Sequence, residues 1–178
     1  MIIPISDIYK VFAQERVISI IPVEDNPVGV AYNPIYNNVY VANHGSNTVS
    51  VINENNVVVD TIPVGNGPIG VAHNEGNGNM YVTNFISRSL SVSDENNVVV
   101  DTIVVRGLPS GVEYNPSYNN MYVTLFSSES VLVLNEDNVV VDTIVVGFSP
   151  FFIEYNPKKQ LHVCDKRSFK VCLYHRPK

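Results

Sequence analysis

The sequence repeats itself every 41 residues, and this repeat constrains the fold more than any other feature. A proline opens a similar phrase in each of four copies: PVGVAYNP at Pro27, PIGVAHNE at Pro68, PSGVEYNP at Pro109 and PFFIEYNP at Pro150. A second phrase, VVVDTI, recurs with the same spacing in the first three copies. A period of this length indicates an array in which each repeat is one supersecondary unit.

Each repeat has the composition of short strands and tight turns. Its apolar runs are brief and β-branched, and Asn, Gly and Pro separate them, which favours strands over helices. The second copy predicts strands A to D at residues 69–73, 80–84, 90–93 and 98–105. Between C and D lies DENN, a turn in which Asn accepts a positive φ. Four short antiparallel strands make one β-propeller blade, and such blades bury both faces only by stacking on one another.

A motif on strand B gives the repeat a family resemblance. Residues 81–84 spell YVTN, and the other copies read YVAN at 40–43, YVTL at 122–125 and HVCD at 162–165. Together with PxGVAxNP, VSVIN and TIPVG, the motif resembles the YVTN-repeat β-propeller family, over nearly all of residues 17–174. The resemblance implies an all-β propeller. By analogy with archaeal and bacterial surface-layer and envelope proteins, it also implies an adhesion or scaffold role at the cell surface.

The strand count predicts how the array closes. Strands A to D occur three times, and the last copy adds A, B and C, with Phe152 in place of the glycine of the other copies. Residues 17–23 align with strand D at 58–64, so we expect four blades of four antiparallel strands, with this N-terminal strand completing the C-terminal blade. Residues 17–178 then form one domain. Residues 1–16 are an N-terminal extension, in which 8–11 align with strand C.

Two other arrangements stay open. Two chains could combine into one eight-bladed ring, or the chain could be a fragment of a longer array. We therefore expect a monomer or a homodimer.

The loops predict a binding face. The A–B and C–D turns fall at one end of the blades and are near copies of one another, whereas the B–C and D–A loops at the other end vary. The varied loops contain phenylalanines and arginines, which are the usual anchors of interfaces. The predicted binding residues are Phe85, Arg88, Arg106, Phe126, Phe148, Arg167 and Phe169. Alternatively, the phenylalanines fill space between the blades.

The axis offers a second candidate site. Strand A lies innermost in a propeller, and alanines of the first two copies become Glu113 and Glu154 in the last two. Two carboxylates near a narrow axis could hold a hard metal cation with backbone carbonyls, or share a raised pKa. A water-filled channel without an ion is the alternative.

The sequence favours binding over catalysis. It has no HExxH or HxH pair of histidines, no GxSxG elbow and no phosphate loop. We expect a non-catalytic binding or scaffold module that needs no cofactor and takes a protein or other macromolecular ligand. The alternative is a small propeller enzyme of the lyase or hydrolase type, or a metal-holding propeller. Its site at the axis mouth would use His73 with Glu113 and Glu154.

Charge and composition narrow the partners and the compartment. A net charge of −6 without a basic stripe argues against nucleic acid, and no apolar stretch is long enough for a membrane span. No signal peptide is seen, which favours the cytoplasm unless a leader has been removed, whereas the family resemblance favours the cell surface. Cys164 and Cys172 fall on strands B and C of the last copy, roughly opposite each other, so they are bonded or remain free thiols.

Overall fold

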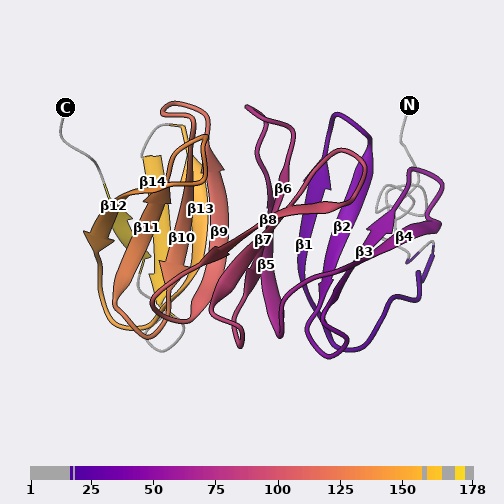
Figure 1. Cartoon of the computed structure of the whole chain (residues 1–178), viewed down its shortest axis with the longest axis horizontal. Coiled ribbons are helices and arrows are strands. Elements are labelled where there is room, and N and C mark those ends of the chain that lie inside the picture. Colours follow the sequence, from indigo (N-terminus) through magenta and orange to yellow (C-terminus); the bar gives the residue numbers. More distant parts are fainter. Residues whose placement is uncertain (1–16, 18, 158–159, 166–170, 175–178) are drawn as a thin grey trace, which may run out of the picture.

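The computed structural model describes residues 17, 19–157, 160–165 and 171–174, and every regular element in this part is a β-strand. The strands form four antiparallel sheets, blades 1 to 4, in which consecutive strands are neighbours (Figure 1). Blade 1 comprises β1 (Pro27–Asn33), β2 (Asn38–Asn43), β3 (Thr48–Ile52) and β4 (Val58–Pro63). Blade 2 comprises β5 (Pro68–His73), β6 (Met80–Asn84), β7 (Ser89–Ser93) and β8 (Val99–Val104). Blade 3 comprises β9 (Pro109–Asn115), β10 (Asn120–Leu125), β11 (Ser130–Leu134) and β12 (Val140–Val145). Blade 4 comprises β13 (Pro150–Asn156), β14 (Gln160–Asp165) and β15 (Val171–Tyr174). No helix of the described residues is long and apolar enough to cross a membrane.

The strands predicted for the second repeat are confirmed to within a residue at each end. The turn between β7 and β8 shows why. Asp94 accepts hydrogen bonds from the backbone of Asn96 and Val98, and Asn97 takes a φ of 61°. Asn56 and Asn138 take the same conformation in the neighbouring blades. The turn residues therefore fix where strand C ends and strand D begins.

The hydrophobic core lies between blades rather than within them. Tyr40, Val49 and Val51 of blade 1 pack against Val71 and Met80 of blade 2. The faces between blades 2 and 3 pack in the same way, with Tyr81, Leu90 and Val92 against Met121 and Leu132. Since each blade buries two apolar faces, an internal blade needs a neighbour on each side.

The Tyr and Asn of the YVTN motif have structural roles. The hydroxyl of Tyr81 in blade 2 donates to Asn138 Oδ1 in blade 3, at 2.6 Å, and Asn138 Nδ2 donates to Asp101 of blade 2, at 3.0 Å. Tyr40, Asn97 and Asp60 repeat this latch between blades 1 and 2. The Asn84 side chain donates to the hydroxyls of Ser89 and Ser91 on strand C. The recurring aspartates of strand D thus hold blades together.

The Thr of the motif links the innermost strands. Thr83 Oγ1 accepts a hydrogen bond from the backbone N–H of Gly70 and donates to the carbonyl of Ser110 in blade 3, at 2.8 and 2.6 Å. Thr124 makes the equivalent contacts with Gly111 and with the carbonyl of Phe151 in blade 4. The threonine therefore bridges two blades where their inner strands approach most closely.

Replacing Asn97 tests the latch between blades. Asn97→Ala removes the bonds to Tyr40 and Asp60 and places alanine at a positive φ, so we expect a loss of about 1–3 kcal/mol in the free energy of unfolding. Asn97→Gly removes the same bonds but accepts the backbone angle, and its smaller loss measures the side chain alone. Urea unfolding of both variants checks this. Equal stability of the wild type and both variants would show that these hydrogen bonds do not hold blades 1 and 2 together.

The predicted closure of four blades within one chain is wrong. Residues 17 and 19–23 belong to no strand, and β15 lies at an edge of blade 4 without a fourth strand in the described residues. The blades follow one another in an open arc, with blade 1 and blade 4 on opposite sides of the molecule (Figure 1). The packing of neighbouring inner strands fixes the rotation from blade to blade. At that rotation, blade 4 does not return to blade 1.

Candidate binding surface

The B–C and D–A loops meet at one end of the blades, as the sequence predicts. The backbone N–H of Phe85, which follows β6, donates to the carbonyl of Gly67 in the loop before β5, at 2.9 Å. Phe126 makes the same bond to Leu108, and His44 to Asn26. In blades 1 to 3, the B–C loop is therefore tied to the D–A loop that enters the same blade. These hydrogen bonds hold the loops, and any binding residues on them, in fixed positions.

Phenylalanines from three blades form a row at this end. The rings of Phe85 and Phe126 have centroids 6.0 Å apart, and those of Phe126 and Phe151 lie 6.1 Å apart in an edge-to-face arrangement. Phe152 continues the row at 4.8 Å from Phe151. These separations are those of favourable aromatic pairs. Phe85 and Phe126 are half-buried and Phe151 is buried, so the row both packs between blades and lines the surface.

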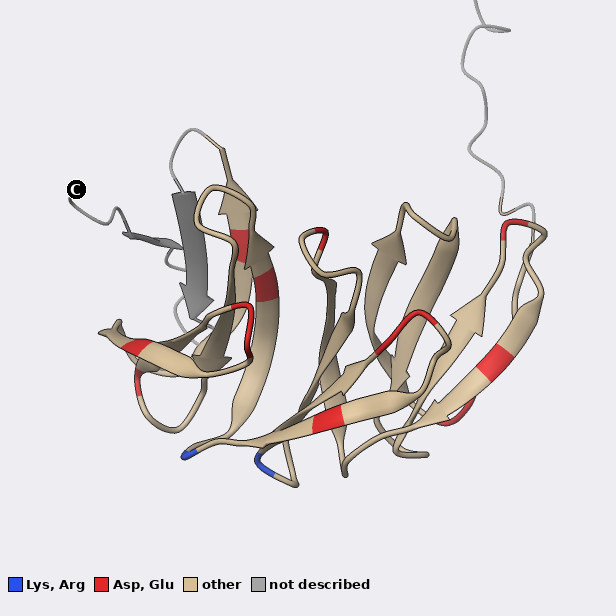
Figure 2. Ribbon diagram, turned by 45° about the horizontal axis from the view of Figure 1, so that its top comes forward, with Lys and Arg blue, Asp and Glu red and all other residues tan. Residues whose placement is uncertain are grey.

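Two of the other predicted residues are exposed on the same loops. Arg88 and Arg106 are exposed, and they are the only Lys or Arg among the described residues. Figure 2 shows both at one edge of the molecule, away from the acidic A–B and C–D turns. Phe148, three residues before Phe151, is 72% exposed. Arg167 and Phe169 lie outside the described residues.

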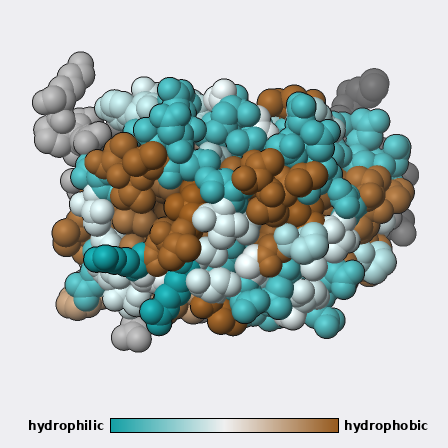
Figure 3. Space-filling model, viewed as in Figure 1, coloured by the Kyte–Doolittle hydropathy of each residue, from teal (hydrophilic) through white to brown (hydrophobic). Residues whose placement is uncertain are grey.

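A hollow of about 410 Å³ opens beside Arg106, between blades 2 and 3. Its lining is mostly apolar and comes from the end of β8 and the loop after it, and from β10, β11, β12 and the B–C loop of blade 3: Val104, Val105, Arg106, Leu125, Ser128, Ser130, Leu132, Val140 and Thr143. Val104 is 80% exposed, although it is a large apolar residue. Figure 3 shows apolar side chains gathered over the outer strands β8 and β12. No sequence feature predicts this hollow, because its valines and leucines resemble ordinary strand residues.

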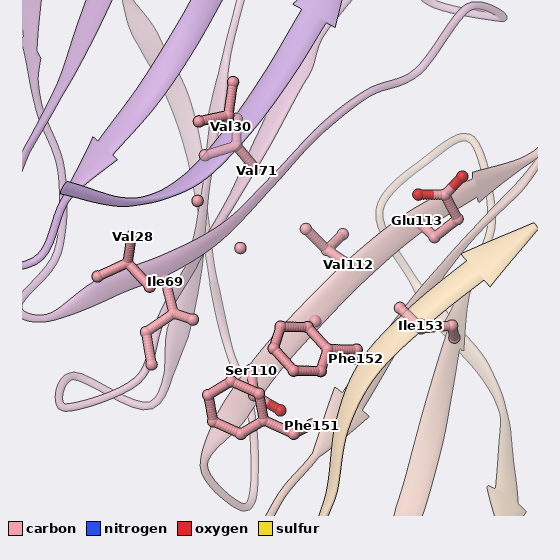
Figure 4. Close-up of a pocket in the computed structure, with 13 residues that line it drawn as sticks. Val28, Val30, Ile69, Val71, Ser110, Val112, Glu113, Phe151, Phe152 and Ile153 are labelled. Carbon is pink, nitrogen blue, oxygen red and sulfur yellow. The ribbon is translucent and has the colours of Figure 1, made fainter. Parts of the chain in front are cut away.

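A second cavity, of about 290 Å³, is the groove along the inner strands β1, β5, β9 and β13 (Figure 4). Phe151 and Phe152 lie side by side at one end of it, and Glu113 lies further along β9. Neighbouring inner strands approach one another closely because glycine occupies one position on each of the first three of them. A Cβ on Gly29, Gly70 or Gly111 would stand 1.9, 2.5 or 2.9 Å from a carbonyl oxygen of the next blade.

Glu113 is the most perturbed acid in the described part of the chain. Burial, with a smaller contribution from nearby Glu154, raises its pKa to about 7, and the backbone N–H of Tyr155 opposes the shift by donating to the carboxylate. The structure thus brings Glu113 and Glu154 near each other on β9 and β13. Among the described residues, no group of three or more His, Cys, Asp and Glu side chains could hold a metal ion. A cation held by this pair stays a prediction.

His73 does not join the two glutamates. It lies opposite Met80 in the sheet, and Met80 packs toward blade 1. Glu113 lies opposite Tyr122, which packs toward blade 4. Burial lowers the pKa of His73, which favours a neutral ring. The trio named for an enzyme site is therefore divided between two interfaces.

The two cysteines are not cross-strand partners. Cys164 lies opposite Val171, and Cys172 lies opposite Val163. The expected pairing is therefore wrong by one residue, because the β14–β15 hairpin keeps the register of the other blades, in which Val41 lies opposite Ser50 and Val82 opposite Ser91.

Comparison with solved structures identifies the architecture. The chain is similar to hydrazine synthase of Kuenenia stuttgartiensis, with a TM-score of 0.74 and 20% identity over 90% of this chain and 47% of that one. It is also similar to virginiamycin B lyase of Staphylococcus aureus, with a TM-score of 0.70 and 13% identity over 85% and 56% of the two chains. A chain of the mitotic checkpoint complex matches with a TM-score of 0.73 and 10% identity over 84% and 49%. The fold is that of a β-propeller.

The β-propeller likeness covers only part of the matched proteins. The chain spans about half the length of the solved chains it matches. No family profile and no curated protein matches it, so the YVTN family remains a resemblance carried by the motif residues.

Proposed function

We propose that the chain is a non-catalytic binding module that holds a protein segment at the end formed by its B–C and D–A loops. The observation that carries the proposal is the apolar hollow between blades 2 and 3, with Arg106 in its lining. Propeller folds occur in enzymes and in protein complexes alike, so the proposal rests on this surface and not on the fold.

The surface matches a ligand that is both apolar and acidic. The hollow offers room for one large apolar side chain, and exposed Phe148 offers a second apolar contact at the same end. Arg106 and Arg88 supply positive charge, and an arginine binds a carboxylate through two parallel hydrogen bonds. Aromatic residues and arginine also contribute the largest share of binding energy at interfaces. We therefore propose a peptide segment that carries a large apolar residue next to glutamate or aspartate.

Short synthetic peptides test the ligand class directly. Four fluorescently labelled peptides would carry a leucine and two glutamates, the leucine alone, the glutamates alone, or neither, in an otherwise Gly–Ser sequence. We expect fluorescence anisotropy to detect binding of the first peptide and clearly weaker binding of the other three. Arg106→Ala should weaken binding of the first peptide by roughly tenfold, because it removes a charge-assisted contact.

A matched control distinguishes binding at this site from nonspecific binding. Phe148→Ala should weaken binding of the same peptide several-fold, whereas Tyr118→Ala should leave it unchanged. Tyr118 is an exposed aromatic residue on the opposite end of the blades. Equal binding of all four peptides, or an equal loss in the Tyr118 variant, would count against the proposal.

A further inference from the structure

The first face of blade 1 lacks the neighbour that every internal blade has. Val30 of β1 is 66% exposed, whereas Val71 and Val112 at the same position of blades 2 and 3 are 8% and 5% exposed. Val28 and Tyr32 on the same strand are exposed as well. The inner part of this face therefore exposes apolar side chains. In blades 2 and 3, the corresponding side chains are covered by the preceding blade.

The chain enters blade 1 as if a strand D came before it. His44 and Gly45 donate to the carbonyls of Asn26 and Asp25, as Phe85 and Ile86 donate to those of Gly67 and Asn66 one repeat later. Asn26 also takes a φ of 53°, close to the 64° of Gly67. The loop before blade 1 therefore has the geometry of a regular D–A loop. Residues 19–23 precede this loop in the sequence, as strand D precedes each later D–A loop.

The sequence of this segment matches the strand that blade 4 lacks. Residues 19–23 read SIIPV and align with DTIPV at 60–64, which include the end of β4. In blades 1 to 3 such a strand pairs with strand C. The segment has no strand partner in the described residues, and the outer edge of β15 has none either. The two lie on opposite sides of the arc, so one chain cannot join them (Figure 1).

We propose that residues 19–23 of one copy add as the fourth strand to β15 of a second copy, so that two chains close one eight-bladed ring. Each copy supplies the strand the other lacks, which gives a two-fold symmetric dimer without free sheet edges at the two junctions. Two arcs, each about half the length of the propeller chains they match, together make up one such length. This inference is independent of the ligand proposed above.

Phe152 makes the packing at the two junctions between copies differ from the packing between blades of one copy. It occupies the position where blades 1 to 3 carry glycine, and it is 60% exposed on the last inner strand. Its ring prevents the close approach of inner strands seen between the other blades. In the dimer it lies instead against the exposed Val28 and Val30 of the second copy, an apolar contact that covers both surfaces.

An engineered disulfide tests the strand pairing. In blade 1, Val41 lies opposite Ser50, and Ser50 lies opposite Thr61. Cys172, opposite Val163, holds the place of Ser50 in blade 4, and Ile20 holds the place of Thr61. Ile20→Cys would therefore stand across from Cys172 of the second copy, within reach of a disulfide. We expect mild oxidation to give a covalent dimer on a non-reducing gel.

Two control variants show which native cysteine forms the disulfide. Adding Cys172→Ser to Ile20→Cys should abolish the covalent dimer, and adding Cys164→Ser should preserve it. Light scattering of the unaltered 178-residue chain should give twice the 19.7 kDa of one copy. The mass of a single chain, a disulfide formed within one chain, or a dimer without the Cys172 link would each overturn the proposal.

Discussion

Gly70→Ala is expected to destabilise the chain by more than about 3 kcal/mol. A Cβ at this position would lie 2.5 Å from the carbonyl oxygen of Ser110 and 2.9 Å from Thr83 Oγ1. Those two atoms are hydrogen-bonded to each other, and Thr83 also accepts a hydrogen bond from the backbone N–H of Gly70. None of the three groups can therefore move away without breaking a hydrogen bond. The methyl group would force blades 2 and 3 apart where the core depends on their contact. Urea unfolding gives the change in free energy.

A second glycine provides the control for this result. Gly78 lies in the A–B turn of blade 2 with a φ of 78°, and no atom lies within 4 Å of the place a Cβ would take. Gly78→Ala should therefore cost only backbone strain, about 1 kcal/mol, and Gly78→Asn less still. If Gly70→Ala were no worse than Gly78→Ala, the blades would not pack through their inner strands as described.

Glu113→Gln is expected to stabilise the chain at pH 8 by up to about 3 kcal/mol, since one pKa unit corresponds to about 1.4 kcal/mol. Burial raises the folded-state pKa of Glu113 from 4.5 to about 7. The folded chain therefore keeps a proton on this carboxyl where the unfolded chain has lost it. The stability that this proton provides is fully present below pH 4.5 and is lost as the pH rises through 7. Glutamine stays neutral at every pH and can still accept the bond from the backbone of Tyr155.

The pH dependence distinguishes this cause from a general effect of removing charge. The advantage of Glu113→Gln over the wild type should shrink steadily between pH 8 and pH 5. The matched variant Glu129→Gln, at an exposed loop position, should leave the pH dependence of unfolding as it is in the wild type. An advantage of Glu113→Gln that stays constant from pH 5 to pH 8 would contradict a buried carboxyl with a raised pKa.

The sequence predicted the blades well because their boundaries depend on local chemistry. The Asp-Glu-Asn-Asn turn fixes the end of β7 through bonds between residues two to four apart, and Asn97 supplies the positive φ. The same local rules placed the varied loops together at one end. The recurring Asp60 and Asp101 accept hydrogen bonds from Asn97 and Asn138 of the next blade, so their repetition has a structural cause.

Closure of the ring could not be predicted from the strand count, because it depends on the angle between blades. That angle follows from how closely Gly29, Gly70 and Gly111 let the inner strands approach, a property of packing and not of pattern. The cross-strand partners of Cys164 and Cys172 likewise depend on the exact register of the β14–β15 hairpin, in which Cys172 lies opposite Val163. A shift of one residue changes every cross-strand partner.

The candidate site was predicted in part. Exposed phenylalanines and arginines on variable loops stood out from the repeat, and Phe85, Phe126 and Arg106 do lie at one end of the blades. The hollow beside Arg106 did not stand out, because Leu125 and Leu132 are core residues in every strand pattern. The hollow arises from the spacing between neighbouring blades, which the strand pattern of a single blade does not show.

Successive blades turn about one axis and bring their B–C and D–A loops to a common end. Nuclear Overhauser contacts between the rings of Phe85, Phe126 and Phe151, in protein with only phenylalanine protonated, test this arrangement. We expect contacts from Phe126 to each of the other two rings, since the centroids lie 6.0 and 6.1 Å apart. Their absence in a folded sample would contradict the stacking of blades 2, 3 and 4 on which the proposed surface depends.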